Sequence, residues 1–211
     1  METIQLSDEK HRYEFSEISC LHIKEIHHGL LPFLGPKLLG ELYKALTKLE
    51  LISIWAVKSD GRIIGFLAGT HASNKRALGF FLKKKSILAL RLMIRLFRVP
   101  QSARMVVSLV KNSAKNVFFK NKTRSRPQAE LLAIAVDKCF QGSGIGKALI
   151  LCYEDFVEKS GLNEYVVMTN VNENGSNAFY KAMGFKEHCL TPHHDLVLRV
   201  YIKEIDKAKK A

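Results

Sequence analysis

A glycine-rich stretch between an apolar run and a helical pattern constrains this chain more than any other feature. Glu130–Val136 is nearly continuous in apolar residues, and Gln141–Gly146 (Gln-Gly-Ser-Gly-Ile-Gly) follows it closely. A helical pattern then continues to about Lys159. Glycines let a backbone approach a ligand, and the free N–H groups and dipole of a first helical turn favour phosphate. The sequence therefore predicts a buried strand that leads into a phosphate-binding loop.

The spacing of the glycines argues against the two commonest nucleotide-binding loops. A Rossmann fingerprint needs its third glycine three residues after its second, and Gly142, Gly144 and Gly146 do not fit that spacing. A P-loop needs Gly-Lys-Ser/Thr, and here Lys147 is followed by Ala148.

The periodicity of the remaining sequence predicts alternating helices and strands. The expected elements are a short strand at Tyr13–Ser16, helices from Ile18 and from Pro36, strands at Ile52–Val57 and Arg62–Thr70 joined by a hairpin turn, a strand at Tyr165–Val171, a short helix at Asn177–Met183, and strands at Phe185–His188 and Asp195–Ile205. This order indicates one α/β domain over residues 1–211, with a mixed twisted sheet, helices on both faces and a helical insert at about residues 74–129.

Two linked motifs resemble the GNAT family of acetyltransferases. The acetyl-CoA motif of that family is Gln/Arg-x-x-Gly-x-Gly/Ala, and Gln141, Gly144 and Gly146 occupy its three positions. The second signature is an asparagine followed by a short helix that ends in Tyr-x-x-x-Gly-Phe, and Tyr180 to Phe185 match that ending. The resemblance implies a GNAT-like fold and an N-acetyltransferase that uses acetyl-CoA as its co-substrate.

The resemblance also implies roles for individual residues. It places the pantetheine arm against the backbone of Ile134, Ala135 and Val136, and the pyrophosphate on the loop formed by Gln141, Gly142, Ser143, Gly144, Ile145, Gly146 and Lys147. The family asparagine normally stands seven residues before the tyrosine. That position is Glu173 here, so Asn172 or Asn174 is expected to contact the cofactor instead.

Transfer of an acetyl group to an amine needs a proton donor for the CoA sulfur and a base for the amine. Tyr180 is the candidate acid, because a phenol stays protonated at neutral pH; the alternative is that its ring only packs under the cofactor. Glu130 is the candidate base, the alternative being a solvated carboxylate at a strand end, and His71 is a second candidate. The His27-His28 and His193-His194 pairs lack the spacing of a metal site, so no metal is expected.

Positive charge is concentrated in the middle of the chain. The net charge is +13, and residues 74–129 contain fifteen Lys and Arg residues with no Asp or Glu. Lys84, Arg91, Arg95 and Arg98 fall on one edge of an otherwise apolar helical pattern. The insert is interpreted as a helical cap with solvated charges, as a wall that attracts an anionic acceptor, or as a helix that rests on anionic lipid. No aromatic interleaving or reader motif indicates nucleic acid.

The sequence favours a small-molecule amine as the acceptor, in particular an amino sugar or a nucleotide-linked amino sugar. The alternatives are a non-catalytic CoA-binding or membrane-surface module, and acetylation of protein or peptide amines. The four cysteines, Cys20, Cys139, Cys152 and Cys189, show no disulfide or zinc spacing. Their pattern, a polar N-terminus and the lack of a long apolar run predict a cytoplasmic protein.

Overall fold

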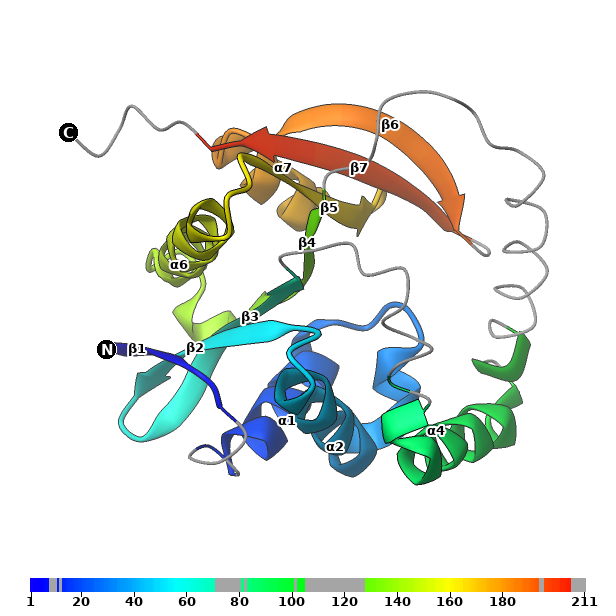
Figure 1. Cartoon of the computed structure of the whole chain (residues 1–211). Coiled ribbons are helices and arrows are strands. Elements are labelled where there is room, and N and C mark those ends of the chain that lie inside the picture. Colours follow the sequence, from blue (N-terminus) through cyan, green and yellow to red (C-terminus); the bar gives the residue numbers. More distant parts are fainter. Residues whose placement is uncertain are drawn as a thin grey trace.

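The computed structural model describes residues 1–7, 11, 13–70, 81, 83–100, 102–104, 128–193 and 196–205. Its elements are β1 (Glu2–Gln5), α1 (Glu14–Glu25), the 3-10 helix η1 (Leu31–Leu34), α2 (Gly35–Lys48), β2 (Ser53–Ser59), β3 (Arg62–Thr70), α4 (Ser86–Arg98), β4 (Ala129–Val136), the 3-10 helix η2 (Lys138–Phe140), α6 (Ile145–Lys159), β5 (Glu164–Asn170), α7 (Asn174–Ala182), β6 (Lys186–His193) and β7 (Leu196–Glu204). The strands form a seven-stranded sheet in the order β1-β2-β3-β4-β5-β7-β6 (Figure 1). The mixed α/β architecture predicted from the sequence is confirmed.

The sheet opens at its centre, between β4 and β5. These two strands are parallel, and they pair only where Ala129–Leu131 lies opposite Tyr165–Val167. On its other side β4 follows β3 in an antiparallel ladder as far as Val136, with a bulge near Gly69. Within the described part of the chain, the carboxyl half of β4 therefore pairs with β3 and with no strand on the β5 side.

The first strand lies closer to the N-terminus than the sequence predicted. Glu2–Gln5 forms β1 and pairs antiparallel with β2, whereas the expected strand Tyr13–Ser16 is wrong because Glu14 begins α1. Four residues of alternation could not outweigh the helical spacing of Phe15, Ile18 and Leu21, which are all buried.

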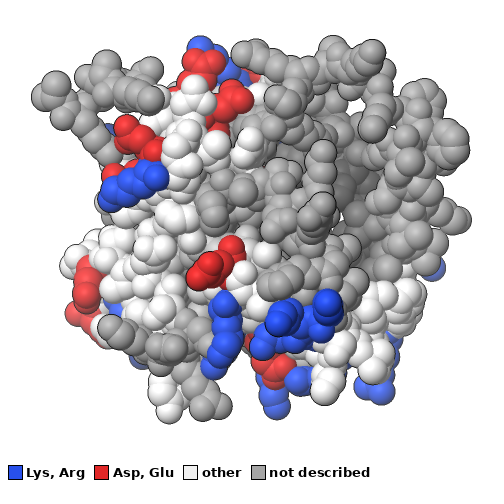
Figure 2. Space-filling view, viewed as in Figure 1, with Lys and Arg blue, Asp and Glu red and all other residues white. Residues whose placement is uncertain are grey.

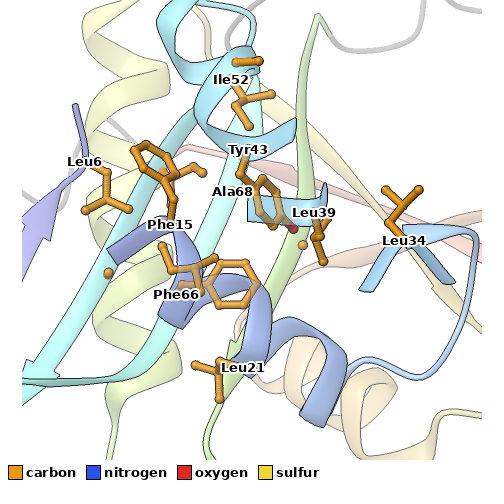
Figure 3. Packing of buried hydrophobic residues seen from close by; sticks show 14 of the residues in the cluster. Leu6, Phe15, Leu21, Leu34, Leu39, Tyr43, Ile52, Phe66 and Ala68 are labelled. Carbon is orange, nitrogen blue, oxygen red and sulfur yellow. The ribbon is translucent and has the colours of Figure 1, made fainter. Parts of the chain in front are cut away.

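Hydrophobic clusters cover both faces of the sheet. On one face Phe15 of α1 and Tyr43 of α2 pack with Phe66 of β3 (Figure 3). On the other face the fully buried Leu149 and Tyr153 of α6 pack in a cluster that also contains residues of β3, β4, β5, α7 and β7. The predicted helices on both faces are confirmed, and the two clusters pack against β3 and β4 from opposite sides.

The hairpin between β2 and β3 has the predicted turn. Asp60 and Gly61 both have positive φ angles, 52° and 76°, as a two-residue turn between twisted strands requires. No helix among the described residues is long and apolar enough to cross a membrane.

Only part of the predicted insert can be compared with the structure. The helix expected there is present as α4, which contacts η1 and α2 (Figure 1). Residues 71–80 and 105–127 lie outside the described part of the chain.

Candidate functional site

The predicted phosphate loop forms the entry to α6. Gly142 and Gly144 have φ angles of 80° and 86°, a conformation that favours glycine, and Gly144 is the N-cap residue of α6. Among the described residues, nothing accepts a hydrogen bond from the amide groups of Gly144 to Lys147. A cluster of free N–H groups at the positive end of a helix dipole is suited to an anionic phosphate ligand.

At Gly146 a glycine is required by close packing and not by the backbone conformation. A Cβ atom there would stand 3.1 Å from the ring of Phe179 on α7, which is tighter than ordinary packing. Gly146 therefore lets α6 and α7 approach each other at the base of the loop, whereas Gly142 and Gly144 have open space around them.

The loop borders a cavity of about 550 Å³, which we call the glycine-loop cavity. It is lined by residues of α1, β4, η2, the loop, the start of α6, the turn before α7, and α7: Glu25, Ile134, Ala135, Val136, Phe140, Gln141, Gly142, Gly144, Ile145, Gly146, Lys147, Glu173, Gly175, Ser176, Phe179 and Tyr180. Its volume is in the range of small-molecule and cofactor sites.

The open half of β4 contributes backbone groups to this cavity. The Asp137 amide group donates to Ile64 O on the β3 side at 2.8 Å. Because backbone groups alternate in direction along a strand, those of Ile134 and Val136 face away from β3, into the opening. The Gln141 side chain donates to Val136 O at 3.0 Å, which ties the loop to the end of the strand.

A second cavity, which we call the histidine cavity, occupies about 390 Å³ on the other side of the opening. Its lining residues are Glu25, Ile26, His27, His28, Gly29, Leu132, Ala133, Ile134, Ala135, Val136, Gln141, Met168, Thr169, Asn170, Glu173, Ser176, Tyr180, Leu196 and Leu198. Ile134–Val136, Glu173 and Tyr180 line both cavities, which are therefore two parts of one opening.

Tyr180 lies where the two cavities meet. Its residue is only 5% exposed, and its ring packs against Phe179, Phe185 and Tyr201. Burial raises the pKa of its hydroxyl group above the ordinary tyrosine value, so the group stays protonated at neutral pH. No described residue forms a hydrogen bond with that hydroxyl group, which leaves it available to a ligand.

The turn before α7 is held by a buried asparagine that the sequence did not single out. Asn177 Nδ2 donates to the carbonyl oxygens of Asn170 at 2.9 Å and Glu173 at 2.7 Å, and Asn177 Oδ1 accepts from the Tyr201 hydroxyl group at 3.0 Å. These bonds fix the turn, and with it Glu173 and the start of the helix that carries Tyr180.

Three charged or titratable side chains that line the histidine cavity were not predicted to belong to the site. His28 Nε2 forms a hydrogen bond with the Glu173 carboxylate, which joins the segment after α1 to the turn before α7. Glu25 is mostly buried, and its carboxylate accepts a hydrogen bond from the Lys138 amide group at 3.3 Å. Among the described residues, the lining of the histidine cavity thus has two carboxylates and two histidines, and no Lys or Arg.

Most of the predicted cofactor residues line the glycine-loop cavity, but four predicted site residues line neither cavity. These four are Glu130, Ser143, Asn172 and Asn174. Glu130 lies at the opposite end of β4, where its amide group bonds to Thr70 Oγ1 at 3.2 Å. His71, His194 and the side chain of His193 lie outside the described residues, and the described part of the chain contains no group of side chains that could hold a metal ion.

Comparison with known proteins agrees with this geometry. The model of the acetyltransferase (GNAT) family matches residues 23–185. The chain belongs to the GNAT family. As a GNAT acetyltransferase it is an acyltransferase, and the matched region runs from α1 to the end of the second predicted motif. No curated protein sequence matches the chain.

Solved structures share the GNAT fold at low sequence identity. Aminoglycoside 6'-acetyltransferase type Ii superimposes with a TM-score of 0.60 at 12% identity, covering 98% of both chains. The ribosomal-protein-S18-alanine N-acetyltransferase from Escherichia coli gives 0.54 at 14% identity, covering 99% of this chain and 97% of that one. The PaiA N-acetyltransferase from Thermoplasma acidophilum, solved with coenzyme A, gives 0.54 at 15% identity, covering 97% and 99%. The first two are named for different acceptors, an aminoglycoside and the alanine of a ribosomal protein, and at identities this low the likeness shows the fold alone.

Proposed function

We propose that this GNAT acetyltransferase transfers an acetyl group from acetyl-CoA to the primary amine of a small molecule. The observation that carries the proposal is the continuous opening between β4 and β5, with unpartnered helix amides on one side and an acidic cavity on the other. The amides of Gly144 to Lys147 suit the CoA pyrophosphate, and the Ile134 and Val136 backbone groups suit the pantetheine arm.

The chemistry that we propose is direct attack of the amine on the thioester. The amine nitrogen bonds to the acetyl carbon, the carbon–sulfur bond breaks, and the departing sulfur takes a proton from the Tyr180 hydroxyl group. The backbone N–H of Val136, which faces the opening, stabilises the negative charge that develops on the carbonyl oxygen.

The amine must lose a proton, and Glu173 is the carboxylate best placed to accept it. Glu173 lines both cavities and its side chain is 42% exposed, whereas Glu130 lines neither cavity. The hydrogen bond with His28 holds the Glu173 carboxylate in place in the lining of the histidine cavity. We therefore place the proton acceptor at Glu173 and retain Glu130 as the sequence-based prediction to test against it.

The charge of the histidine cavity favours an acceptor that is a cation in solution. Glu173 attracts an ammonium group, as does Glu25 to the extent that Lys24, 3.7 Å away, leaves its charge unpaired, and the described lining offers no Lys or Arg for a phosphate. An amino sugar meets this requirement. A nucleotide-linked amino sugar would need cations that the described lining does not supply.

The decisive experiment is a screen of amines for release of the CoA thiol. Purified protein and acetyl-CoA are incubated with amino sugars, polyamines, small aromatic amines and peptides with free N-termini, with Tyr180→Phe protein as the control. We expect turnover with a small cationic amine. Turnover with peptides alone would assign the protein-acetylating alternative. Binding of acetyl-CoA without any turnover would assign the non-catalytic alternative.

A further inference from the structure

The helix α4 has a buried face and a separate exposed apolar face. Ala89, Leu92 and Leu96 are buried in the cluster that α1, α2 and η1 share. The opposite side of the helix carries large apolar side chains with high exposed fractions: Ile87 77%, Leu90 61%, Met93 42%, Ile94 45% and Phe97 51%. Their spacing of three and four residues makes one continuous stripe along the helix, which we call the α4 stripe.

Two of the arginines that the sequence grouped on α4 fasten the helix to the fold. The Arg91 guanidinium pairs with both carboxylate oxygens of Glu41 on α2, at 2.6 and 3.2 Å. Arg95 Nε donates to Phe33 O in η1 at 3.2 Å. These contacts hold α4 with its stripe outward, and neither cavity is lined by an α4 residue. The described residues therefore do not support α4 as a wall that attracts the acceptor.

Cations border the stripe, and residues 74–129 contain no Asp or Glu, so that Glu41 of α2, which pairs with Arg91, is an acidic neighbour from outside this stretch. Lys83, Lys84, Arg98 and Arg104 are exposed at or beyond the two ends of the helix. The whole stretch from 74 to 129 has fifteen Lys and Arg residues and no Asp or Glu. On the face in Figure 2, the surface over α4, at the lower right, is uncharged or basic.

An exposed apolar stripe of this length needs a partner, because soluble surfaces rarely leave such a patch open. A second copy of the chain would bring like charges together at the same surface. An anionic lipid surface matches both properties at once, since the apolar stripe enters the acyl boundary and the flanking cations meet the headgroups.

We infer that α4 is an interfacial helix that binds the protein to an anionic lipid surface. The stripe from Ile87 to Phe97 lies in the membrane interface, and Lys84 and Arg98 contact anionic headgroups. The helix runs parallel to the surface, as its thirteen residues and its attachment to α2 and η1 require. This inference is independent of the acceptor, because it uses no residue of the two cavities.

Sedimentation with lipid vesicles tests the inference on the full chain. Wild-type protein is mixed with vesicles of phosphatidylcholine alone, or with added phosphatidylglycerol. The apolar variant is Leu90→Ser with Phe97→Ser, and its control is Leu151→Ser with Leu190→Ser, two leucines of similar exposure, 52% and 54%, on α6 and β6. The charge variant is Lys84→Gln with Arg98→Gln, and its control is Lys181→Gln with Lys186→Gln, which are exposed elsewhere.

We expect wild-type protein to bind the vesicles that contain phosphatidylglycerol and not those of phosphatidylcholine alone. The affinity of the apolar variant for these vesicles should be lower by at least roughly tenfold. Each lost charge should lower the affinity by about fivefold. Both control variants should bind like wild type. Circular dichroism and the melting temperature of each variant show whether it is folded.

Three results would overturn the inference. The first is wild-type protein that stays in the supernatant when anionic vesicles are sedimented. The second is folded variants that bind the vesicles as tightly as their controls. A third would be concentration-dependent dimers in sedimentation velocity that the apolar variant abolishes, because the α4 stripe would then be a surface between two copies of the chain.

Discussion

His28 Nε2 and the Glu173 carboxylate form a hydrogen bond in the wall of the histidine cavity, joining the turn before α7 to the segment after α1. The two residues are 145 positions apart in the chain, and both line this cavity. The contact therefore holds the Glu173 carboxylate in the part of the opening that Tyr180 also lines, where we propose that the acceptor amine approaches the thioester.

Replacement of Glu173 by Gln should slow acetyl transfer. The amide keeps the shape of the side chain but cannot take a proton, so kcat should fall by roughly 10²-fold at neutral pH. The deficit should narrow as the pH rises toward the pKa of the acceptor, because free amine then needs no base. Glu187→Gln is the control, because the Glu187 side chain is likewise 42% exposed and has a basic partner, Arg199. An equal decrease of kcat in the two variants would show that Glu173 does not act as the base.

Replacement of Gly144 by Glu should abolish acetyl-CoA binding. The new carboxylate would stand among the free amides of the loop and repel the pyrophosphate. Gly161→Glu is the matched control, because Gly161 also has a positive φ, 78°, and open space, but lies beyond the other end of α6. Both variants carry the same backbone strain. Calorimetry should therefore detect acetyl-CoA binding only in Gly161→Glu protein, and binding in both would refute the site.

Replacement of Tyr180 by Phe should separate chemistry from binding. The ring and its packing stay, while the proton donor is lost, so kcat should fall by roughly 10²-fold with nearly unchanged acetyl-CoA affinity. Tyr43→Phe is a control for loss of a buried hydroxyl group, because Tyr43 lies in the cluster on the opposite face. Full kcat in the Tyr180 variant would leave its ring only a packing role.

Stability should decrease in mild acid because His22 is buried in its neutral form. Desolvation lowers the pKa of His22 to about 4, from an ordinary value near 6.5. The unfolded chain takes up this proton first, so the free energy of unfolding is constant above pH 6.5 and falls between about 6.5 and 4. Between pH 7.5 and 5 the loss from this residue is about 2 kcal/mol.

Urea titrations of wild-type and His22→Gln protein measure this loss. The amide oxygen of the introduced glutamine can accept the hydrogen bond from Tyr43 Oη, which lies 2.7 Å from His22 Nδ1 in the wild-type protein. Other groups that titrate in acid affect both proteins equally, so the difference between the two isolates His22. Identical pH dependence in the two proteins would show that His22 is accessible to protons in the folded state.

Local patterns predicted the fold well because the strands and helices are strongly periodic. The bounds of Arg62–Thr70 are reproduced, and Gln141–Gly146 forms the predicted entry to α6. The first strand was missed because Glu2–Gln5 has few apolar residues and depends on pairing with β2. That pairing joins segments distant in the sequence, so no local sequence pattern predicts it.

The site was predicted only where a motif carries it. Tyr180 and the glycine loop lie within contiguous signatures, so sequence spacing could locate them. Glu25 and His28 reach the same cavity from a segment far in the chain from Glu173, and only the fold brings them together. Glu130 was predicted from its place at the start of β4, but the opening lies further along the strand.

The separation of β4 and β5 leads us to expect that the stability of this protein depends on its proposed co-substrate. Among the described residues, the backbone groups that face the opening have no strand to pair with, and a bound pantetheine arm would complete the sheet. A ligand at one hundred times its dissociation constant adds about 2.7 kcal/mol to the free energy of unfolding. We expect a higher melting temperature with CoA and slower cleavage by protease, so that the amount of enzyme in a cell follows the CoA supply.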